Sequence, residues 1–333
     1  MTHPNSLDGV LVQWGERLFY PANRMVRASA PYLTGAWLHE RAQSVRRCVA
    51  ATVVRRAPQV MVKVTGGGRG MGAIAAHLRY ISKGGRLPFE DDRGVARDGK
   101  EALRDLTEQW RHGGAQIPET SLRREAFNIM LSMPSGTDPE FVRRAAREFG
   151  KVELASHRYV MVLLTHQANP HVHLSVRAAG RDGKRLNPRK EDLHRWRETF
   201  AEKLRERGIE AEASSQATRG ANRRSKRVWE RQSSAASRAD LRPGQKSGPA
   251  YRETRLRSMK AWAEIAKALA SSTDLTDREL SASIIAYVSQ TPSVRSMQRE
   301  RAQRGQQPLP GMDVMRDTRT VQPRSRMGPE IGR

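Results

Sequence analysis

The chain has 333 residues, a formal net charge of +25 and a mean hydropathy of −0.71, and only 5% of its residues are aromatic. So strong a positive charge favours a polyanionic partner, of which nucleic acid is the commonest. The single cysteine, Cys48, excludes an intrachain disulfide framework and a cysteine-based zinc site, and no apolar run is long enough to span a bilayer.

The composition also predicts how the chain is divided. The first residues lack the basic and apolar regions of a secretory signal peptide, and a lone cysteine suits a reducing compartment, so we expect a cytoplasmic protein. Low apolar content at both ends favours a folded centre with loosely ordered ends. We expect an N-terminal extension of unassigned function (1–57), a folded domain (58–215), a basic linker (216–252), a short helical region (253–292) and a disordered basic tail (293–333).

The first half of the folded domain opens with β-branched residues that predict a strand over 60–65. A flexible glycine-rich loop is expected over 66–72, then a short helix over 73–81. The glycines imitate a dinucleotide fingerprint, but the helix is too short and no good second parallel strand follows. A polar stretch over 90–100 leads to a helix over 102–110.

The second half predicts a strand over 126–133, a helix over 138–149 with proline in its first turn, and a hairpin of strands 158–164 and 171–178. A helix follows over 190–208, in which Trp196 and Phe200 are expected to pack in the core. Beyond the linker, helices are predicted over 255–271 and 276–290. The second is expected to open with a capping box that runs from Thr276 to Glu279.

Three histidines lie within eight residues at the hairpin: His166, His171 and His173. Because side chains alternate faces along a strand, His171 and His173 point the same way, while Val172 points into the core. Two neighbouring imidazoles are ready to hold one metal ion. This spacing favours metal binding over three unrelated histidines.

A metal beside DNA suggests phosphodiester chemistry, in which an ion stabilises charge on the scissile phosphate. The candidate nucleophile is Tyr80, in the sequence that runs from His77 to Lys83. A free tyrosine has a pKa of about 10, so nearby cations or the metal would have to favour its phenolate. Without the histidines, packing is the better interpretation of this side chain.

Three motifs together resemble the relaxase/mobilisation nuclease family, the MobA/VirD-type branch of the His-hydrophobic-His (HUH) endonucleases of conjugative and mobilisable plasmids. The first runs from Arg79 to Leu87 and has Tyr80 in the nucleophile's place. The second, from Asn128 to Pro134, is similar to the family's DNA-placing motif and contains Ser132. The third, from Asn169 to Leu174, is the metal motif. The resemblance covers about residues 58–215.

The resemblance implies an α+β fold: a mostly antiparallel central sheet of about five strands with flanking helices, plus flexible terminal extensions. It also implies a strand-specific nick at a plasmid transfer origin, with Tyr80 forming a 5′-phosphotyrosyl intermediate and Mg²⁺ or Mn²⁺ held by the three histidines. Implied partners are single-stranded and origin hairpin DNA, relaxosome accessory proteins and a type IV coupling protein, and the protein would be translocated with the DNA. The tail over 316–333 resembles a secretion signal.

Six residues are predicted to contact DNA. Ser132 is taken from the second motif, and five cations are chosen for their closeness to the motifs: Arg79, Lys83, Arg86, Arg177 and Lys184.

The chain departs from the family at one position. A further histidine usually lies seven residues before the triplet, and here that residue is Leu164. If the strand continues, His166 shares its face and supplies the third nitrogen; otherwise the site has two ligands and binds metal poorly. Two hypotheses stay open: an active relaxase, or a catalytically impaired member that acts as an origin DNA-binding protein. A replication initiator is a weaker third, because Tyr80 precedes the histidines.

Overall fold

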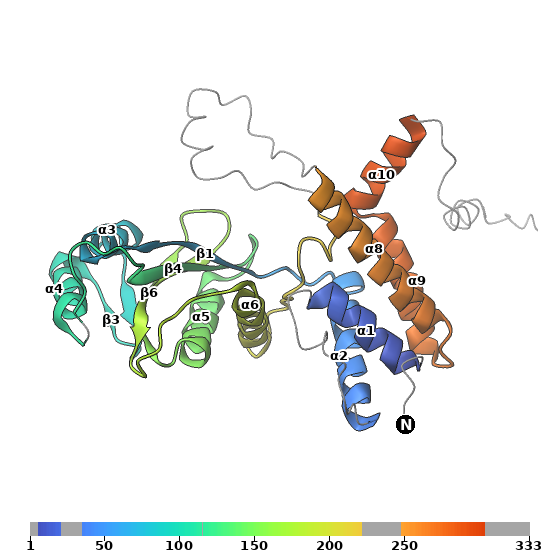
Figure 1. The fold of residues 1–333 in the computed structure, drawn as a ribbon, viewed down its shortest axis with the longest axis horizontal. Helices are drawn as coiled ribbons and strands as arrows, with labels where there is room; N and C mark the ends of the chain where they lie inside the picture. Colours follow the sequence, from blue (N-terminus) through green and yellow to red (C-terminus); the bar gives the residue numbers. More distant parts are fainter. Residues whose placement is uncertain (1–5, 21–34, 115, 222–247, 304–333) are drawn as a thin grey trace, which may run out of the picture.

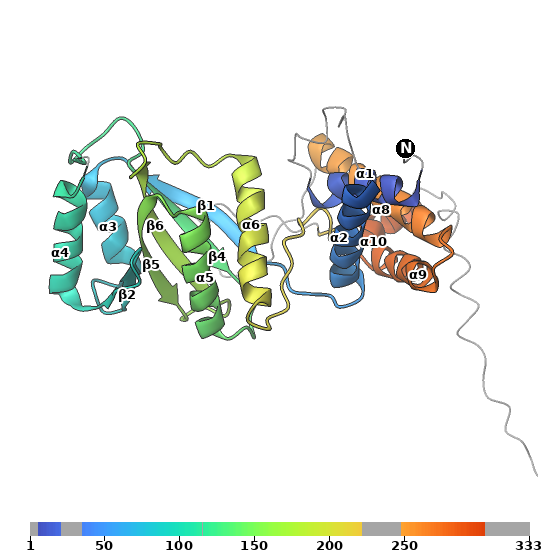
Figure 2. The ribbon, with the colours of Figure 1, turned by 90° about the horizontal axis from the view of Figure 1, so that it is seen from below.

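The structure, a computed structural model, describes residues 6–20, 35–114, 116–221 and 248–303. These residues form two parts that lie side by side (Figures 1 and 2). We call the part from β1 to α6 the sheet domain, and the helices from the two ends of the chain the helical unit. The predicted secretion signal over 316–333 and most of the predicted linker lie outside the described residues, whereas the first part of the predicted disordered tail, 293–303, is helical.

The sheet domain is built on six antiparallel strands in the order β1-β4-β6-β5-β2-β3. This antiparallel sheet, together with the helices that flank it, confirms the predicted α+β class. The segment predicted as a polar stretch overlaps two short strands, β2 and β3, at one end of the sheet, and these raise the strand number from the expected five. The strands are β1 (Met61–Gly68), β2 (Phe89–Asp91), β3 (Ala96–Arg97), β4 (Ala126–Ser132), β5 (His157–Leu164) and β6 (His171–Gly180).

Helices cover the two faces of the sheet unequally. On one face α5 (Pro139–Glu153) and α6 (Lys190–Arg205) close the main core, where Trp196 and Phe200 are fully buried as predicted. On the other face α3 (Met71–Ile81) and α4 (Gly99–His112) form a smaller core with Val160 and Val162 of β5. On this second face Met61 and Lys63 of β1 stay exposed.

The glycine run 66–68 is part of β1, so the predicted loop is wrong at these residues. A bulge between Val64 and Gly66 shifts the register, and the strand then continues to Gly68. A Cβ on Gly67 would lie 2.3 Å from the carbonyl oxygen of Ala126, and one on Gly68 would lie 2.5 Å from Ile74. The glycines therefore allow a close approach of strand and helix, and flexibility does not explain them.

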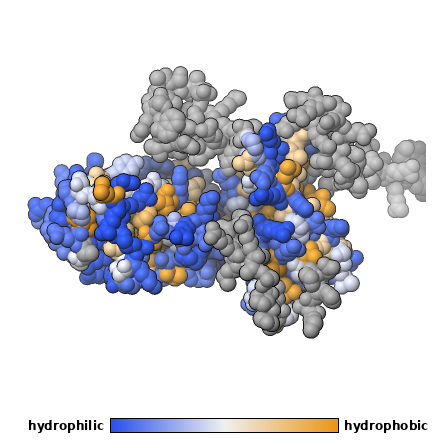
Figure 3. All heavy atoms as spheres, viewed as in Figure 1, coloured by the Kyte–Doolittle hydropathy of each residue, from blue (hydrophilic) through white to orange (hydrophobic). Residues whose placement is uncertain are grey.

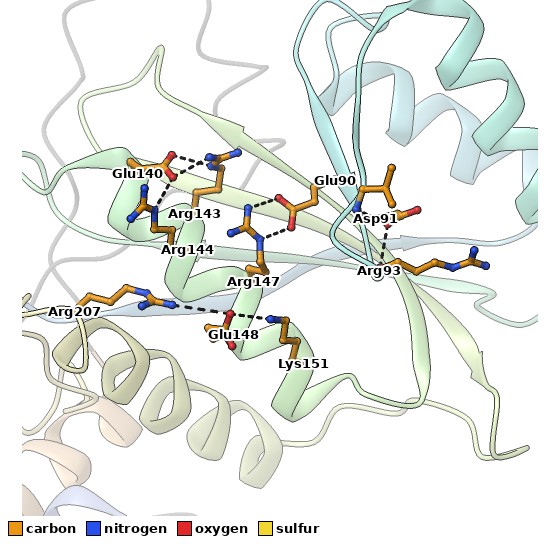
Figure 4. Close-up of polar contacts among 11 residues, drawn as sticks. Glu90, Asp91, Arg93, Glu140, Arg143, Arg144, Arg147, Glu148, Lys151 and Arg207 are labelled. Atoms are coloured by element: carbon orange, nitrogen blue, oxygen red, sulfur yellow. Dashed lines mark hydrogen bonds and ion pairs between the residues drawn. The ribbon is translucent and has the colours of Figure 1, made fainter.

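An ion-pair network fixes α5 to the sheet edge (Figure 4). Glu90 of β2 is buried and accepts two hydrogen bonds from Arg147 of α5, of 2.5 and 2.7 Å. Two turns earlier on α5, Glu140 pairs with Arg143 and Arg144 at the surface, and these guanidinium groups lower the pKa of Glu140 to about 2.

The helical unit joins segments that the sequence suggested were separate extensions. Helices α1 (Leu7–Phe19) and α2 (Gly35–Val53) pack with α8 (Pro249–Ala270) and α9 (Leu275–Ser289) around a shared apolar core, and α10 (Pro292–Gln303) contacts α9. Arg46 of α2 is bonded to both carboxylate oxygens of Asp277 and to Asp8. Apolar residues at helical spacing give these helices one buried side, although the mean hydropathy of the whole chain is low.

The start of α9 differs from the predicted capping box. Asp274 is the N-cap, and its side chain accepts a hydrogen bond from the Thr276 amide. Asp277, expected inside the box, is instead buried against Arg46. Asp277 therefore forms a long-range ion pair, whereas the local sequence pattern placed it within the capping box.

Helix α6 meets the helical unit through a partly polar junction. The rings of Tyr20 and His194 are in edge contact at 5.2 Å, and the Trp262 indole donates to the Thr218 carbonyl at 2.8 Å. Burial lowers the pKa of His194 to about 4 and raises that of Glu198, on the same helix, to about 7. Among the described helices, none combines the length and apolar character needed to cross a bilayer.

Candidate functional site

The site begins with two histidines on β6. His171 lies opposite Ser132 and Leu164 in the sheet, and His173 lies opposite Met130 and Val162. Residues opposite one another in a ladder share a face, so both imidazoles point to the side of the sheet where α3 packs. Their ring centres are 5.2 Å apart. The alternation of the strand predicts this arrangement.

Helix α3 brings two more rings to the same place. His77 lies 6.3 Å from His173, and Tyr80 stacks on His77 at 6.5 Å, centre to centre. Residues three apart on a helix are neighbours, which puts His77 and Tyr80 on one side of α3. The Tyr80 side chain is 75% exposed, so its phenol is open to a large substrate.

His77 is the residue that the sequence analysis missed. Its position three residues before Tyr80 was a signal, because any nucleophile on a helix has its i−3 neighbour beside it. That the neighbour also reaches β6 depends on how α3 lies on the sheet. Ile74 and Leu78, both buried in the smaller core, set that placement.

His166 lies beyond the end of β5, on an exposed bend. Strand β5 therefore ends before His166, whereas the first alternative required the strand to continue through it. Its ring is nevertheless 6.1 Å from that of His171. Leu164 is the last residue of β5 and is buried directly opposite His171.

The ring nitrogens of the site are largely free of protein partners. His171 donates from Nδ1 to the Asn169 carbonyl at 2.9 Å, which leaves its Nε2 as a lone-pair donor. The buried Nε2 of His77 and Nδ1 of His173 have no hydrogen-bond partner. Desolvation lowers the pKa of both residues to about 4, with the neighbouring histidines contributing at His173. These imidazoles are neutral at pH 7.

Neutral imidazoles with unpartnered nitrogens have the donor chemistry of a divalent metal site. A second partner on a ligating histidine, such as the Asn169 carbonyl on His171, is typical of such sites. The third ligand is not in place: among the described residues, no three His, Cys, Asp or Glu side chains converge as a metal-binding group. The residues thus fit a metal as the pair His171 and His173, with His166 as the nearest further donor.

Three of the predicted DNA contacts surround Tyr80. Arg79, Lys83 and Arg86 are all exposed at the end of α3 and in the turn after it. Lys83 adopts a left-handed backbone conformation, with φ of 50°, and its carbonyl accepts a hydrogen bond from Arg86. The bond ties the Arg86 guanidinium to the turn that follows Tyr80.

The other three predicted contacts are placed differently. Arg177 is buried, donates to the Gly113 carbonyl, and has its pKa lowered by burial. Ser132 is buried and donates to the Pro170 carbonyl, which ties β4 to the hairpin turn. Lys184 is exposed but follows the far end of β6, about 30 Å of extended strand from His171. These three residues stabilise or border the sheet, and their contact with DNA stays a prediction.

Comparison with known families gives a match within the sheet domain. A family model described as relaxase, MobA/VirD2-like, nuclease domain matches residues 86–209. The matched segment includes the three hairpin histidines, whereas His77 and Tyr80 precede it. A search of curated proteins gives no match.

Proposed function

The sheet domain is a relaxase nuclease domain of the MobA/VirD2-like family, and from this premise we propose that the protein nicks one strand of DNA at a plasmid transfer origin with Tyr80 as nucleophile. The family match supports DNA as the substrate class and nicking as the reaction class. The family match does not identify the nucleophile, the metal or the role in transfer, and these three are part of the proposal.

One observation carries it: an exposed phenol lies at one end of a row of imidazoles. The row runs from Tyr80 through His77 and His173 to His171, with ring centres 5.2–6.5 Å apart. Arg79 and Lys83 are placed to attract the backbone of a strand that approaches the phenol.

In the proposed step the Tyr80 oxygen attacks the scissile phosphorus. The new bond is between that oxygen and phosphorus, and the bond that breaks joins phosphorus to the 3′ oxygen. The phenol loses its proton as its oxygen attacks, and the leaving 3′ oxygen takes up a proton, so there is no net gain or loss of protons. The 5′ end stays attached to Tyr80. Transesterification conserves a phosphodiester-type bond, so the step requires no nucleotide hydrolysis.

His171 and His173 would hold a Mg²⁺ or Mn²⁺ ion, assisted by His166. Such an ion polarises a non-bridging phosphate oxygen and stabilises charge in the transition state. The main-chain bond from His171 to Asn169 fixes the ring orientation, and burial keeps the imidazole of His173 neutral and able to ligate.

A covalent-adduct assay tests the nucleophile. Full-length protein is mixed with plasmid DNA that carries the region flanking its own gene, with Mn²⁺, and quenched with detergent. The proposal expects protein attached to a 5′ end in the wild type and none in Tyr80→Phe. An adduct that persists in Tyr80→Phe would show that another residue attacks.

A second candidate function is supported by Leu164. A buried leucine opposite His171, with no converged third ligand among the described residues, fits a family member that recognises origin DNA and recruits partners without cleaving it. This function predicts DNA binding that is unaffected by a chelator. An adduct in Leu164→His alone would favour it over the active relaxase.

The transfer role adds partners to the proposal. A nicked strand attached to Tyr80 would be passed, with accessory proteins and a type IV coupling protein, into a recipient cell. A mating assay with the plasmid and the Tyr80→Phe variant measures this directly. Transfer that survives the substitution would separate the protein from strand delivery.

A further inference from the structure

The helical unit contributes no residue to the histidine site and lies outside the segment matched to the relaxase family. Its inward charges are satisfied within the unit: Arg46 pairs with Asp8 and Asp277, and Arg41 pairs with Glu16. In the view of Figure 3, hydrophilic residues prevail over the described surface of both parts.

A cluster of cations lies at the seam where α1 packs against α8. The guanidinium of Arg17 lies over the Trp14 ring at 4.5 Å, and the Lys260 ammonium lies over the same ring at 5.5 Å. Both cations are exposed, and neither is within ion-pair distance of a described carboxylate. Trp14 holds two like charges from two helices at a solvent-facing position.

The cluster continues along one side of α8. Arg252, Lys260 and Lys267 lie within about a quarter turn of one another and are all exposed. The stripe spans about 22 Å, at about 1.5 Å per residue. Glu264 is the acid between the two lysines, and it forms no ion pair with either of them.

We propose that this α1–α8 surface, formed by Arg17, Arg252, Lys260 and Lys267, is a second DNA contact, which binds the phosphates of duplex DNA without reading sequence. An exposed cationic stripe on a straight helix is complementary to a polyanionic rod, and its length is about two thirds of a turn of B-DNA.

The surface favours a duplex over an unpaired strand for a specific reason. Proteins that hold single strands combine cations with aromatic rings on which bases stack. Here Trp14 packs against the core of the helical unit and lies under two cations, so its ring is not offered to a base. The surface can therefore contact phosphates, but it provides no ring on which a base could stack.

Binding of a 20-base-pair duplex of arbitrary sequence, followed by fluorescence anisotropy over a range of salt, tests the inference in the full-length protein. Each lost phosphate contact reduces the slope of log affinity against log salt by about 1. The double variant Arg17→Gln/Lys260→Gln is expected to reduce the slope by about 2. The matched control, Arg104→Gln/Arg278→Gln, removes two exposed cations on α4 and α9 and is expected to leave it unchanged.

Three results would overturn the inference. Equal slopes for the wild type and Arg17→Gln/Lys260→Gln would show that these cations do not contact DNA, and equal losses in both double variants would show a diffuse charge effect. A loss confined to a single-stranded oligonucleotide of the same length would reassign the surface to unpaired DNA. Unchanged thermal unfolding of each variant establishes that the fold is retained.

Discussion

Leu164 and His171 lie directly opposite each other across the β5–β6 ladder, with both side chains on the face that carries His173. A histidine at position 164 would therefore enter the imidazole row next to His171. The distance between the two positions is set by the ladder, because opposite Cβ atoms in an antiparallel pair are about 5 Å apart.

Leu164→His is expected to raise affinity for Mn²⁺ by more than about 10-fold, since even an indirect partner of a metal ligand changes affinity by about that factor. Isothermal titration calorimetry measures it. Leu163→His is the matched control, because residue 163 points to the opposite face of the sheet, and it should bind no better than the wild type. Equal affinity in all three proteins would mean that the row does not hold this metal.

His77→Leu is expected to change stability and activity in opposite directions. Removing a buried nitrogen without a partner should raise the free energy of unfolding by about 1 kcal/mol, while loss of the ring beside Tyr80 should slow adduct formation about 10-fold or more. Chemical denaturation and the covalent-adduct assay measure the two effects. His112→Leu, on the exposed side of α4, should leave adduct formation unaffected. A stable His77→Leu protein with full activity would show that His77 serves only in packing.

The junction predicts a dependence of stability on pH. Burial lowers the pKa of His194 to about 4, whereas an unfolded histidine titrates near about 6.5. The stabilising contribution of His194 is therefore complete above about pH 6.5 and is lost as the pH falls toward 4. In this range the unfolded chain binds a proton that the native state does not bind. The loss from this residue is at most about 3 kcal/mol.

In His194→Gln, the free energy of unfolding should fall less steeply than in the wild type between pH 6.5 and 4. Urea denaturation at several pH values gives both slopes, and comparing the two proteins cancels the titration of groups that do not contact His194. Parallel curves for the two proteins would show that His194 is hydrated in solution.

Arg147→Ala is expected to cost about 3 kcal/mol of stability, because it leaves the buried Glu90 carboxylate without its partner. Arg144→Ala removes an arginine from the same helix whose carboxylate partner is at the surface (Figure 4) and should cost less than about 1 kcal/mol. Thermal or urea unfolding distinguishes the two. Similar losses in both variants would mean that the Glu90 pair is as hydrated as the surface pair.

Periodicity alone predicted the central strands and the two helices of the main core to within a few residues. The face shared by His171 and His173 followed from the same alternation, since it depends only on neighbours in sequence. Strand β1 was cut short because its glycines, which are required by contacts with Ala126 and Ile74, have the composition of a loop.

Contacts between distant segments account for what the sequence did not predict. Nothing near Asp277 in the sequence indicates that it pairs with Arg46, and so the union of the two ends of the chain was missed. His77 reaches His173 only because Ile74 and Leu78 orient α3 on the sheet. The burial of Arg177 likewise depends on Gly113, which lies 64 residues away.

The pairing of Arg46 with Asp277, 231 residues apart, has a consequence for biosynthesis. Helices α1 and α2 leave the ribosome while α8 and α9 are still untranslated, so the apolar surfaces that pack on α8 and α9 have no native partner until those helices follow the sheet domain. Helix formation is fast, but a helix pair of this kind gains its stability from packing. During that interval the N-terminal helices depend on chaperones or on transient contacts, and a nascent chain that stalls before α8 leaves them open to proteolysis.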